Sequence, residues 1–315
     1  MAVFTPVDEA EAEPFIRGFG LGRLHELAAI VEGVENTNYR IETDRGRYVL
    51  TLFENRTDEA GLPFCLGLTE HAADHGLPCA RPLRDETGQT LGRLNGRPAA
   101  ILEWLPGAWR REPSAPDLEQ AGRMLARLHL AGRDFKLVRP DPVGRDARRR
   151  LHVRCLERAD GRTAEMLAVI APFVSADAPD PAEGLPSGPI HADWFPDNVL
   201  FDGDDLSGVI DFYLGCTGPW AYDLAVALSA WGFDAQGERL PGALEAFQAG
   251  YEAVRPLTLA ERTALPRLGA VAAVRFTLTR LNDLLFHDPE TLVQPKDPEA
   301  FFRRLEWWSE TSPAD

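Results

Sequence analysis

Lysine is almost missing from this sequence. Of its 33 lysine and arginine residues only Lys136 and Lys296 are lysines, so residues 1–135 contain none. Acidic residues outnumber basic ones by 49 to 33, which gives a formal net charge of -16. Because a nucleic-acid surface or an anionic membrane requires clustered positive charge, we expect neither as a partner.

Long apolar runs and paired cysteines are missing as well. No apolar stretch approaches the roughly 20 residues that span a bilayer, and residues 1–10 lack a basic region followed by an apolar run. The cysteines form no C-x-x-C pair, which argues against a zinc site or a disulfide framework. We expect them to be buried, in a cytoplasmic protein whose oligomeric state the sequence does not indicate. They are Cys65, Cys79, Cys155 and Cys216.

The first hundred residues have the pattern of strands with turns. Tyr39, Ile41 and Thr43 alternate with polar residues, and a turn at 44–47 leads into the β-branched and aromatic run 48–53, which predicts an antiparallel hairpin. A helix is predicted over 62–75. The dipeptide Asn95-Gly96 is typical of a second hairpin, between strands near 90–94 and 98–102.

The pattern becomes helical after residue 104. Apolar residues recur at helical spacing from Leu118 to Leu128, in a segment closed by Gly132. Further helical stretches are predicted over 145–174, 240–254 and parts of 257–308, with a surface connection at 175–189. We therefore expect an α+β fold of two lobes. Residues 1–103 would form a small antiparallel β-rich N-lobe that binds a nucleotide, and residues 104–315 a larger, mainly helical C-lobe.

The segment from His191 to Asp211 contains the residues that indicate chemistry. Two apolar runs, 199–201 and 208–210, flank a polar turn, so a hairpin would bring Asn198 and Asp211 to one place. Phosphoryl transfer requires a carboxylate to orient the attacking hydroxyl and oxygen ligands for Mg²⁺. We predict Asp193 as the catalytic base and Asn198 and Asp211 as Mg²⁺ ligands. The alternative is a polar loop without catalytic importance. We expect His191 to brace the loop by hydrogen bonds.

A nucleotide also needs contacts in the first lobe. A loop between the first two strands would offer backbone N–H groups to phosphate oxygens, and the residues just after a later strand would offer backbone groups to adenine. The alternatives are an ordinary turn and an ordinary lobe junction. The earlier glycines at 18, 20 and 22 do not lie between a strand and a helix, so we do not assign them to the site. The predicted nucleotide-binding residues are Gly33, Asn36, Thr37, Asn38, Glu103 and Leu105.

Several motifs together resemble a known superfamily. The runs 125–129 (LARLH), 191–198 (HADWFPDN), 210–212 (IDF) and 221–225 (AYDLA) are similar to those of aminoglycoside phosphotransferases and choline kinases, which have a protein-kinase-like fold. Segments 33–39, 48–54, 275–281 and 295–298 look like the homoserine kinase branch. This resemblance implies transfer of the ATP γ-phosphate to the hydroxyl of L-homoserine, with Mg²⁺ as the metal.

One position departs from the wider superfamily. Thr51 occupies the place of the strand lysine that usually holds the α- and β-phosphates, a departure that we associate with the homoserine kinase branch. The charge of the phosphates would then be neutralised by loop amides near Asn36 and Asn38, by Mg²⁺ and by an arginine. Glu70, which resembles the usual partner of that lysine, is expected to be a solvated helix residue.

The substrate pocket is less clearly marked. Homoserine is a zwitterion, so its pocket needs a cation for the carboxylate. Arg275 and Arg280 are candidates on a predicted helix, although both could serve structural salt bridges, and Tyr213 is a candidate because it follows Asp211 closely. Asp223 is expected to order the catalytic region by accepting backbone hydrogen bonds, and His129 to be a buried structural residue.

Two other functions stay open from the sequence alone. The same fold could phosphorylate an aminoglycoside, choline-like or sugar hydroxyl, although we find no localised carboxylate cluster of the kind that a polycation requires. The lysine replacement at Thr51 also leaves open a non-catalytic nucleotide-binding protein, against which the presence of Asp193, Asn198 and Asp211 argues.

Overall fold

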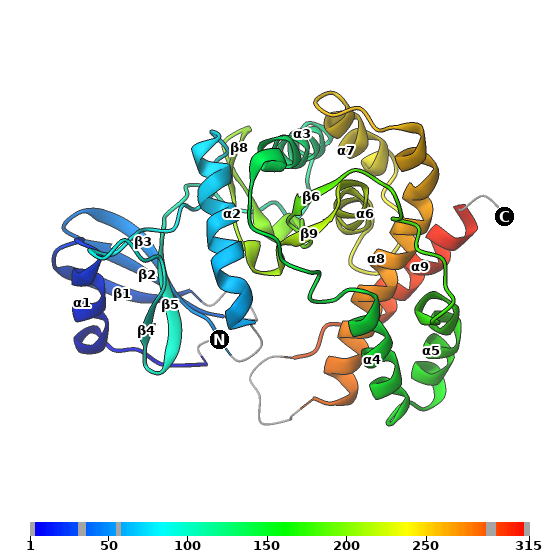
Figure 1. Cartoon of the computed structure of the whole chain (residues 1–315), viewed down its shortest axis with the longest axis horizontal. Helices are drawn as coiled ribbons and strands as arrows, with labels where there is room; N and C mark the ends of the chain where they lie inside the picture. Colours follow the sequence, from blue (N-terminus) through cyan, green and yellow to red (C-terminus); the bar gives the residue numbers. More distant parts are fainter. Residues whose placement is uncertain (1–3, 31–35, 55–57, 288–293, 312–315) are drawn as a thin grey trace.

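The computed structural model describes residues 4–30, 36–54, 58–287 and 294–311. A β-sheet occupies one end of the molecule and a group of helices the other (Figure 1). In chain order the helices and strands are α1 (Glu9–Gly18), β1 (Leu24–Ile30), β2 (Thr37–Thr43), β3 (Gly46–Leu52), α2 (Leu62–Asp74), β4 (Gly92–Leu94), β5 (Arg97–Glu103), α3 (Ala115–Ala131), α4 (Arg145–Leu156), α5 (Gly161–Val174), β6 (Ser187–Ile190), β7 (Val199–Asp202), β8 (Asp205–Val209), β9 (Cys216–Pro219), α6 (Trp220–Trp231), α7 (Ala243–Glu252), α8 (Leu259–Leu285) and α9 (Glu299–Thr311).

The sheet is antiparallel throughout, with strand order β1-β2-β3-β5-β4. Tyr39 and Ile41 alternate inward along β2, as the sequence pattern predicted, and their buried face packs on α1. Both predicted hairpins are confirmed. Asn95 and Gly96 take φ values of 49° and 76°, the left-handed pair that a tight hairpin turn between β4 and β5 requires.

The glycines at 18, 20 and 22 connect α1 to β1. Leu24, at the start of β1, pairs with Thr43, whereas Ile30 at its other end pairs with Asn38. The glycine-rich stretch therefore lies at the opposite end of β1 from the loop expected to bind phosphate. Gly33 of that loop lies outside the described residues.

Helix α2 lies between the sheet and the helical part of the molecule (Figure 1). Phe64 and Leu68 belong to the large core that the C-terminal helices form, whereas Leu62 and Leu66 pack with Ala100 of β5 and its neighbours. The predicted helix over 62–75 is confirmed. Because α2 contributes to both cores, it couples the sheet to the helices.

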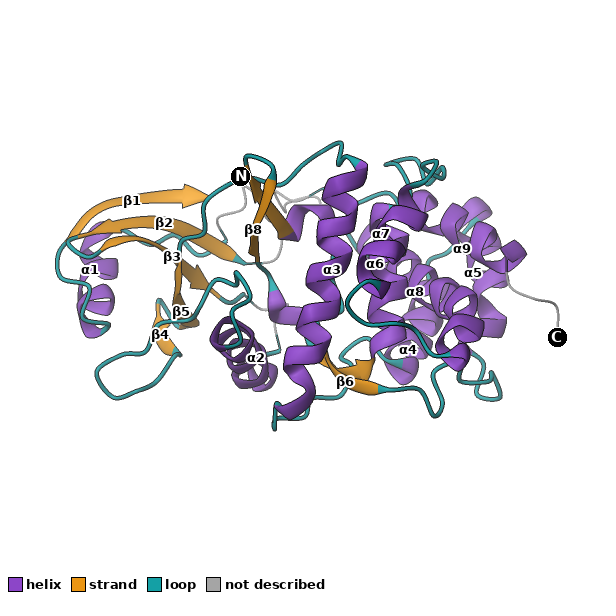
Figure 2. Cartoon of the chain, turned by 90° about the horizontal axis from the view of Figure 1, so that it is seen from above, coloured by secondary structure: helices purple, strands orange, loops and turns teal. Residues whose placement is uncertain are grey.

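The C-terminal helices surround α6, every residue of which is buried (Figure 2). Helix α3 confirms the predicted segment that ends at Gly132. The helix predicted over 145–174 is two helices, α4 and α5, because Asp160 begins a new capping box and Gly161 takes a φ of 41°. All four cysteines are buried and unpaired, as expected.

These elements confirm the α+β expectation of a small antiparallel sheet followed by a larger helical part. We propose residues 103 and 104 as the boundary between the N-lobe and the C-lobe, which is supported by the end of β5 at Glu103. Among the described helices, none combines the length and the apolar character that a membrane span requires.

Candidate active site

The hairpin of β7 and β8 brings the two predicted metal ligands to the same end of the pair. Val199 and Val209 face each other, and the amide of Ile210 donates to the main-chain oxygen of Asn198 at 3.0 Å. Asp211 follows directly, in the left-handed region at φ 64° and ψ 54°. A residue with a β-carbon rarely takes this conformation, and such strain is concentrated at functional sites.

Asp193 and Asn198 are in direct contact. The Asn198 side-chain nitrogen donates to the Asp193 carboxylate at 3.2 Å and to the Asp193 main-chain oxygen at 2.8 Å. Since an amide has one donor and one acceptor end, these bonds assign the nitrogen to Asp193 and leave the Asn198 oxygen as the atom suited to a cation. With the Asp211 carboxylate at the same open end of the hairpin, the site offers the hard oxygen donors that Mg²⁺ prefers.

Ala192 is the second strained residue of the segment, with φ 63°. The peptide groups before and after Ala192 are both held by hydrogen bonds from charged side chains. The carboxylate of Asp223 accepts from the amides of His191 and Ala192, each at 2.8 Å, while Nη1 of Arg275 donates to the Ala192 oxygen at 2.6 Å. The expectation that Asp223 orders the catalytic region by accepting backbone hydrogen bonds is confirmed.

His191 is fully buried and braces the segment, as expected. Its Nδ1 accepts from the amide of Asp193 at 3.2 Å, so its Nε2 carries the proton and donates to the oxygen of Ile210 at 3.0 Å. Burial lowers the pKa of His191 because it disfavours the charged ring. The neutral ring therefore ties the Asp193 loop to the residue before Asp211.

A buried chain of polar groups supports Asp223 from behind. His129 Nε2 lies 3.0 Å from the Asp223 carboxylate and its Nδ1 lies 2.8 Å from the hydroxyl of Tyr251, which accepts from Arg255 at 3.1 Å. Arg255 in turn donates to Glu261 at 2.6 Å. The prediction that His129 is a buried structural residue is confirmed.

Within the contact between Asp223 and His129, the carboxylate of Asp223 is charged and the ring of His129 is neutral. Burial alone raises the pKa of Asp223, but the hydrogen bonds from His129 and the His191 amide outweigh it and lower the pKa of the carboxyl. Burial also lowers the pKa of His129. A neutral His129 that donates from Nε2 and accepts at Nδ1 satisfies every bond in the chain.

The predicted nucleotide residues at the start of β2 have mostly structural side-chain contacts. Thr37 is fully buried and donates to Glu54 at 2.7 Å, and Asn36 accepts from the Glu54 amide at 3.2 Å. Asn38 accepts from the hydroxyl of Thr51 at 2.7 Å. Thr51 therefore orients a side chain at the base of the loop instead of replacing the usual lysine as a cation.

Glu103 and Leu105 lie where β5 leaves the sheet. Glu103 is the last residue of β5, paired with Tyr48, and Leu105 and Ile210 both pack against the apolar cluster that joins the sheet to the C-lobe. A β-carbon at position 208 would lie 2.8 Å from a Leu105 methyl, so Gly208 allows the close approach of β8 to this linker.

The three predicted substrate residues have different surroundings. Arg275 is 1% exposed and holds Ala192. Arg280 is partly exposed, donates to the main-chain oxygen of Asp297 at 2.9 Å, and lies close enough to Asp193 for that carboxylate to oppose the lowering of its pKa by burial. Tyr213 packs edge-on against Phe53 at 4.9 Å, on the sheet side of Asp211.

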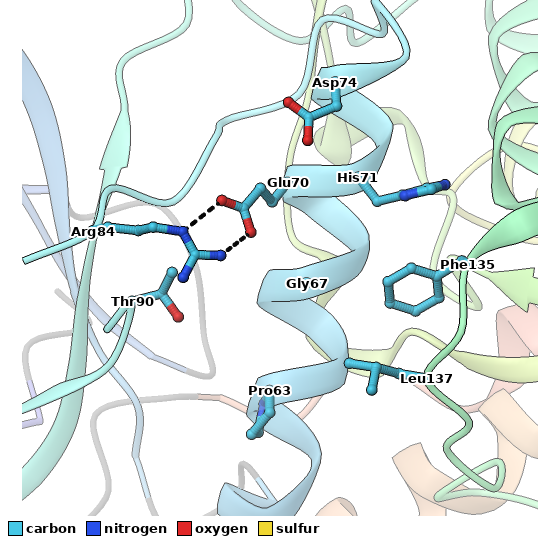
Figure 3. A pocket seen from close by; sticks show the side chains of 9 residues that line it. All are labelled: Pro63, Gly67, Glu70, His71, Asp74, Arg84, Thr90, Phe135 and Leu137. Atoms are coloured by element: carbon cyan, nitrogen blue, oxygen red, sulfur yellow. Dashed lines mark hydrogen bonds and ion pairs between the residues drawn. The ribbon is translucent and has the colours of Figure 1, made fainter. Parts of the chain in front are cut away.

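Glu70 is not the solvated residue that we expected. Its carboxylate makes two bonds to the guanidinium of Arg84, at 2.9 and 2.5 Å, and its side chain is 22% exposed (Figure 3). Its cationic partner is therefore Arg84, in the loop before β4, and not a lysine on a strand. A surface hollow of about 360 Å³ lies beside this pair, and none of its lining residues belongs to the catalytic segment.

Sequence reasoning missed Arg139. This buried arginine donates to the main-chain oxygens of Tyr213 at 2.9 Å and Gly215 at 2.7 Å, and so fixes the segment after Asp211. It also missed the Arg255–Glu261 pair. A signal for Glu261 was present, since Thr258 and Glu261 have the spacing of a capping box and form one.

Comparisons with known proteins show the family to which the chain belongs. The family described as "Phosphotransferase enzyme family" matches residues 26–257. A homoserine kinase of Methylobacterium radiotolerans is 48% identical over 312 residues, covering 97% of this chain and 95% of that protein. A homoserine kinase of Xanthobacter autotrophicus is 45% identical over 305 residues, with 97% and 95% coverage.

Solved structures show the same fold at low identity. An amicoumacin kinase, solved with AMP-PNP and Ca²⁺, gives a TM-score of 0.68 at 15% identity and covers 97% of this chain and 96% of that one. A choline kinase of Cryptosporidium parvum gives 0.64 at 11% identity, with 90% and 88% coverage. The family match and the homoserine kinase relatives show a phosphotransferase with an alcohol group as acceptor. The chain belongs to the phosphotransferase enzyme family, together with the homoserine kinases that it resembles over nearly its full length.

Proposed function

We propose that the protein is a Mg²⁺-dependent homoserine kinase that transfers the γ-phosphoryl group of ATP to the side-chain hydroxyl of L-homoserine. The observation that carries the proposal is the contact between the Asp193 carboxylate and Asn198 at 3.2 Å, at the end of a hairpin that leads into Asp211. It is supported by the 48% identity to a homoserine kinase over nearly the whole chain.

Asp193 is the proposed base. Its carboxylate would accept a hydrogen bond from the homoserine hydroxyl, direct the oxygen toward the phosphorus, and take up the proton as the new bond forms. Asn198 holds this carboxylate in place. Asn198 and Asp211 are the proposed ligands of Mg²⁺, which when bound neutralises charge on the β- and γ-phosphates. Catalysis then rests on positioning, without a covalent enzyme intermediate.

The nucleotide would lie between the sheet and the β7–β8 hairpin. Main-chain groups around Gly33, Asn36, Thr37 and Asn38 are the proposed phosphate contacts, and those of Glu103 and Leu105 the proposed adenine contacts. The assignment is supported by the apolar cluster that joins Leu105 and Ile210 across the two lobes. Nucleotide and divalent metal use are also supported by the related amicoumacin kinase, whose structure contains AMP-PNP and Ca²⁺.

Arg280 is the proposed contact for the homoserine carboxylate. It is partly exposed and lies within electrostatic reach of Asp193 and Asp197. Arg275 is fully enclosed and its hydrogen bond goes to Ala192, so we propose that it positions the loop instead of touching substrate. Tyr213, on the sheet side of Asp211, stays a weaker candidate.

We extend the proposal to the surroundings of the enzyme. A cytoplasmic location is supported by four unpaired buried cysteines, which are usual in a reducing compartment. The acidic net charge of -16 supports a small-molecule partner over nucleic acid or an anionic membrane.

The test is a comparison of acceptors with purified protein, ATP and Mg²⁺. Homoserine should give a phosphorylated product, identified by mass spectrometry, with a kcat/KM far above those for serine, choline and kanamycin. Phosphorylation of another acceptor with none of homoserine would contradict the substrate assignment but leave the kinase assignment intact.

A second comparison tests the base. Asp193→Asn should lower kcat by about 10²- to 10⁴-fold, because the hydroxyl loses its acceptor, with ATP binding retained. Asp204→Asn, a matched change in the exposed turn of the same hairpin, should leave kcat unchanged. Equal activity of both variants would contradict the catalytic role of Asp193.

A further inference from the structure

Two histidines and an aspartate meet where α2 lies against the C-lobe. His71 lies in the last turn of α2 and His75 is the C-cap residue that ends this helix, and Asp134 lies in the short 3-10 turn Gly132–Asp134 directly after α3. One potential ligand atom from each side chain lies within 4.8 Å of the other two. In Figure 3 His71 leaves α2 on the side facing Phe135, opposite to Glu70. This group is separate from the catalytic segment.

The spacing of the three side chains suits a tetrahedral metal ion. The Asp134 carboxylate lies 3.1 Å from His71 Nε2 and 3.8 Å from His75 Nε2. Ligand atoms about 2.0–2.1 Å from a tetrahedral zinc ion are about 3.3–3.4 Å from one another. The two observed distances lie on either side of that value, and all three ligand atoms lie within 4.8 Å of one another, so side-chain rotations that draw them together would complete the site.

The hydrogen bonds already select the correct nitrogen of His75. Its Nδ1 lies 2.8 Å from the main-chain oxygen of His71, so Nδ1 carries the proton and Nε2 presents its lone pair on the side of Asp134. A backbone carbonyl that fixes the tautomer in this way is the usual outer partner of a metal-bound histidine.

Metal binding at Nε2 of His71 would require the ring proton to move to Nδ1, so that the ring stays a neutral imidazole. Its Nε2 lies 2.9 Å from the main-chain oxygen of Ala131 and 3.1 Å from Asp134, which requires a proton on Nε2 when no metal is bound. Among the neighbouring acidic groups of α2, Glu70 is held by Arg84 and Asp74 by Arg81 at 2.7 Å. Asp134 is therefore the carboxylate that faces both histidines.

We propose that His71, His75 and Asp134 bind one divalent transition-metal ion of the Zn²⁺ type, with water completing the coordination, and that the ion joins α2 to the turn after α3. Borderline-soft ions favour imidazole nitrogen with carboxylate oxygen, whereas Mg²⁺ favours oxygen ligands alone. Since α2 also packs in the N-lobe cluster, the ion would tie the sheet side of the molecule to the C-lobe. This proposal does not rest on homoserine as the substrate.

The test uses full-length protein without a histidine tag, stripped with chelator and kept in millimolar Mg²⁺ so that oxygen sites are saturated. Zn²⁺ binding is measured by equilibrium dialysis and Co²⁺ binding by its visible absorption, for wild type, His75→Ala, His75→Gln and Asp134→Asn. His25→Ala is the control, because His25 is another exposed histidine beside an aspartate, 2.7 Å from Asp44, but belongs to no group of three ligands among the described residues.

Wild type and His25→Ala should bind one equivalent of Zn²⁺, give the intense absorption of tetrahedral Co²⁺, and unfold at a higher temperature with Zn²⁺ than without. The His75 and Asp134 variants should bind at least about tenfold more weakly and lose the Zn²⁺-dependent rise in unfolding temperature. Circular dichroism checks that each variant is folded. Equal Zn²⁺ binding by wild type and all three site variants, or no binding by wild type, would overturn the proposal.

Discussion

The guanidinium of Arg275, from the middle of α8, donates a hydrogen bond to the main-chain oxygen of Ala192 at 2.6 Å. Ala192 is held in the left-handed region, and its amide is bound by Asp223. The peptide units on both sides of Ala192 are thus fixed by charged groups from two other helices. Since Asp193 is the next residue, its direction is set by this pair of contacts.

Arg275→Met should therefore lower kcat. A hydrogen bond to a charged group is worth about 1.5–3 kcal/mol, so we expect a loss of roughly tenfold to a hundredfold as Ala192 relaxes, with little change in KM for homoserine. Steady-state kinetics measures kcat and KM, and urea unfolding checks that the variant is folded. Arg303→Gln, a change of an exposed arginine on α9, is the control. A selective rise in KM for homoserine would instead favour direct contact of Arg275 with substrate.

Arg280→Gln should have the opposite kinetic signature. If its guanidinium binds the homoserine carboxylate, its loss removes a charge-assisted bond worth about 1.5–3 kcal/mol. We expect KM for homoserine to rise roughly tenfold or more, with KM for ATP nearly constant. Titration of the variant with homoserine and with ATP separates the two. If both KM values are unaltered, Arg280 does not bind substrate.

The two buried histidines should make stability fall in mild acid. Burial lowers the pKa of His129 and His191, so below about pH 6.5 the unfolded chain binds protons that the folded protein does not. The free energy of unfolding should then decrease as pH falls, by at most about 1.4 kcal/mol per histidine at pH 5.5 relative to pH 7.5. The lowered pKa of Asp223 has its effect at a lower pH than the histidines do. There the free energy of unfolding decreases further as pH falls through the pKa of Asp223 in the folded protein.

Urea unfolding followed by circular dichroism at pH 7.5 and 5.5 measures this difference. In His191→Asn, which removes one of the two titrating rings, the decrease should be about half as large. A protein equally stable at both pH values would show that the rings are not kept neutral by the fold.

The sequence was most informative where local patterns decide the structure. The β7–β8 hairpin follows from two apolar runs around a polar turn, and α3 from apolar residues at helical spacing in a segment closed by Gly132. Helix α1 was missed because Pro14 and few apolar residues obscure its period. Its capping box, Asp8 with Glu11, was the available signal.

Long-range contacts could not be predicted in this way. The partner of Arg275 is a main-chain oxygen, which any residue could supply, and the left-handed conformation of Ala192 has no marker in its side chain. Glu70 meets Arg84 only because the loop before β4 returns to α2. The roles of the site residues thus depended on tertiary structure, even though Asp193, Asn198 and Asp211 were recognisable by spacing.

Thr51→Val tests the role of the residue that replaces the strand lysine. Thr51 is 1% exposed and donates to Asn38 at 2.7 Å. Valine keeps the shape but removes the donor, so Asn38 should lose its orientation at the base of the phosphate loop. A neutral hydrogen bond is worth about 0.5–1.5 kcal/mol, which predicts a rise in KM for ATP of roughly threefold to tenfold. Thr51→Ser should retain wild-type KM, and an equal defect in both variants would point to packing instead.

Glu70→Gln should have little effect on catalysis. In kinases that keep the strand lysine, a glutamate on the corresponding helix is expected to hold that lysine near the phosphates, whereas here Glu70 binds Arg84, in the loop before β4 (Figure 3). The Arg84 side chain is 52% exposed, and exposed ion pairs contribute about 0–1 kcal/mol to stability. We expect kcat/KM within about twofold of wild type and a slightly lower unfolding temperature. A tenfold fall in kcat together with a raised KM for ATP would contradict this. It would mean that Glu70 leaves Arg84 and contacts the nucleotide during the reaction.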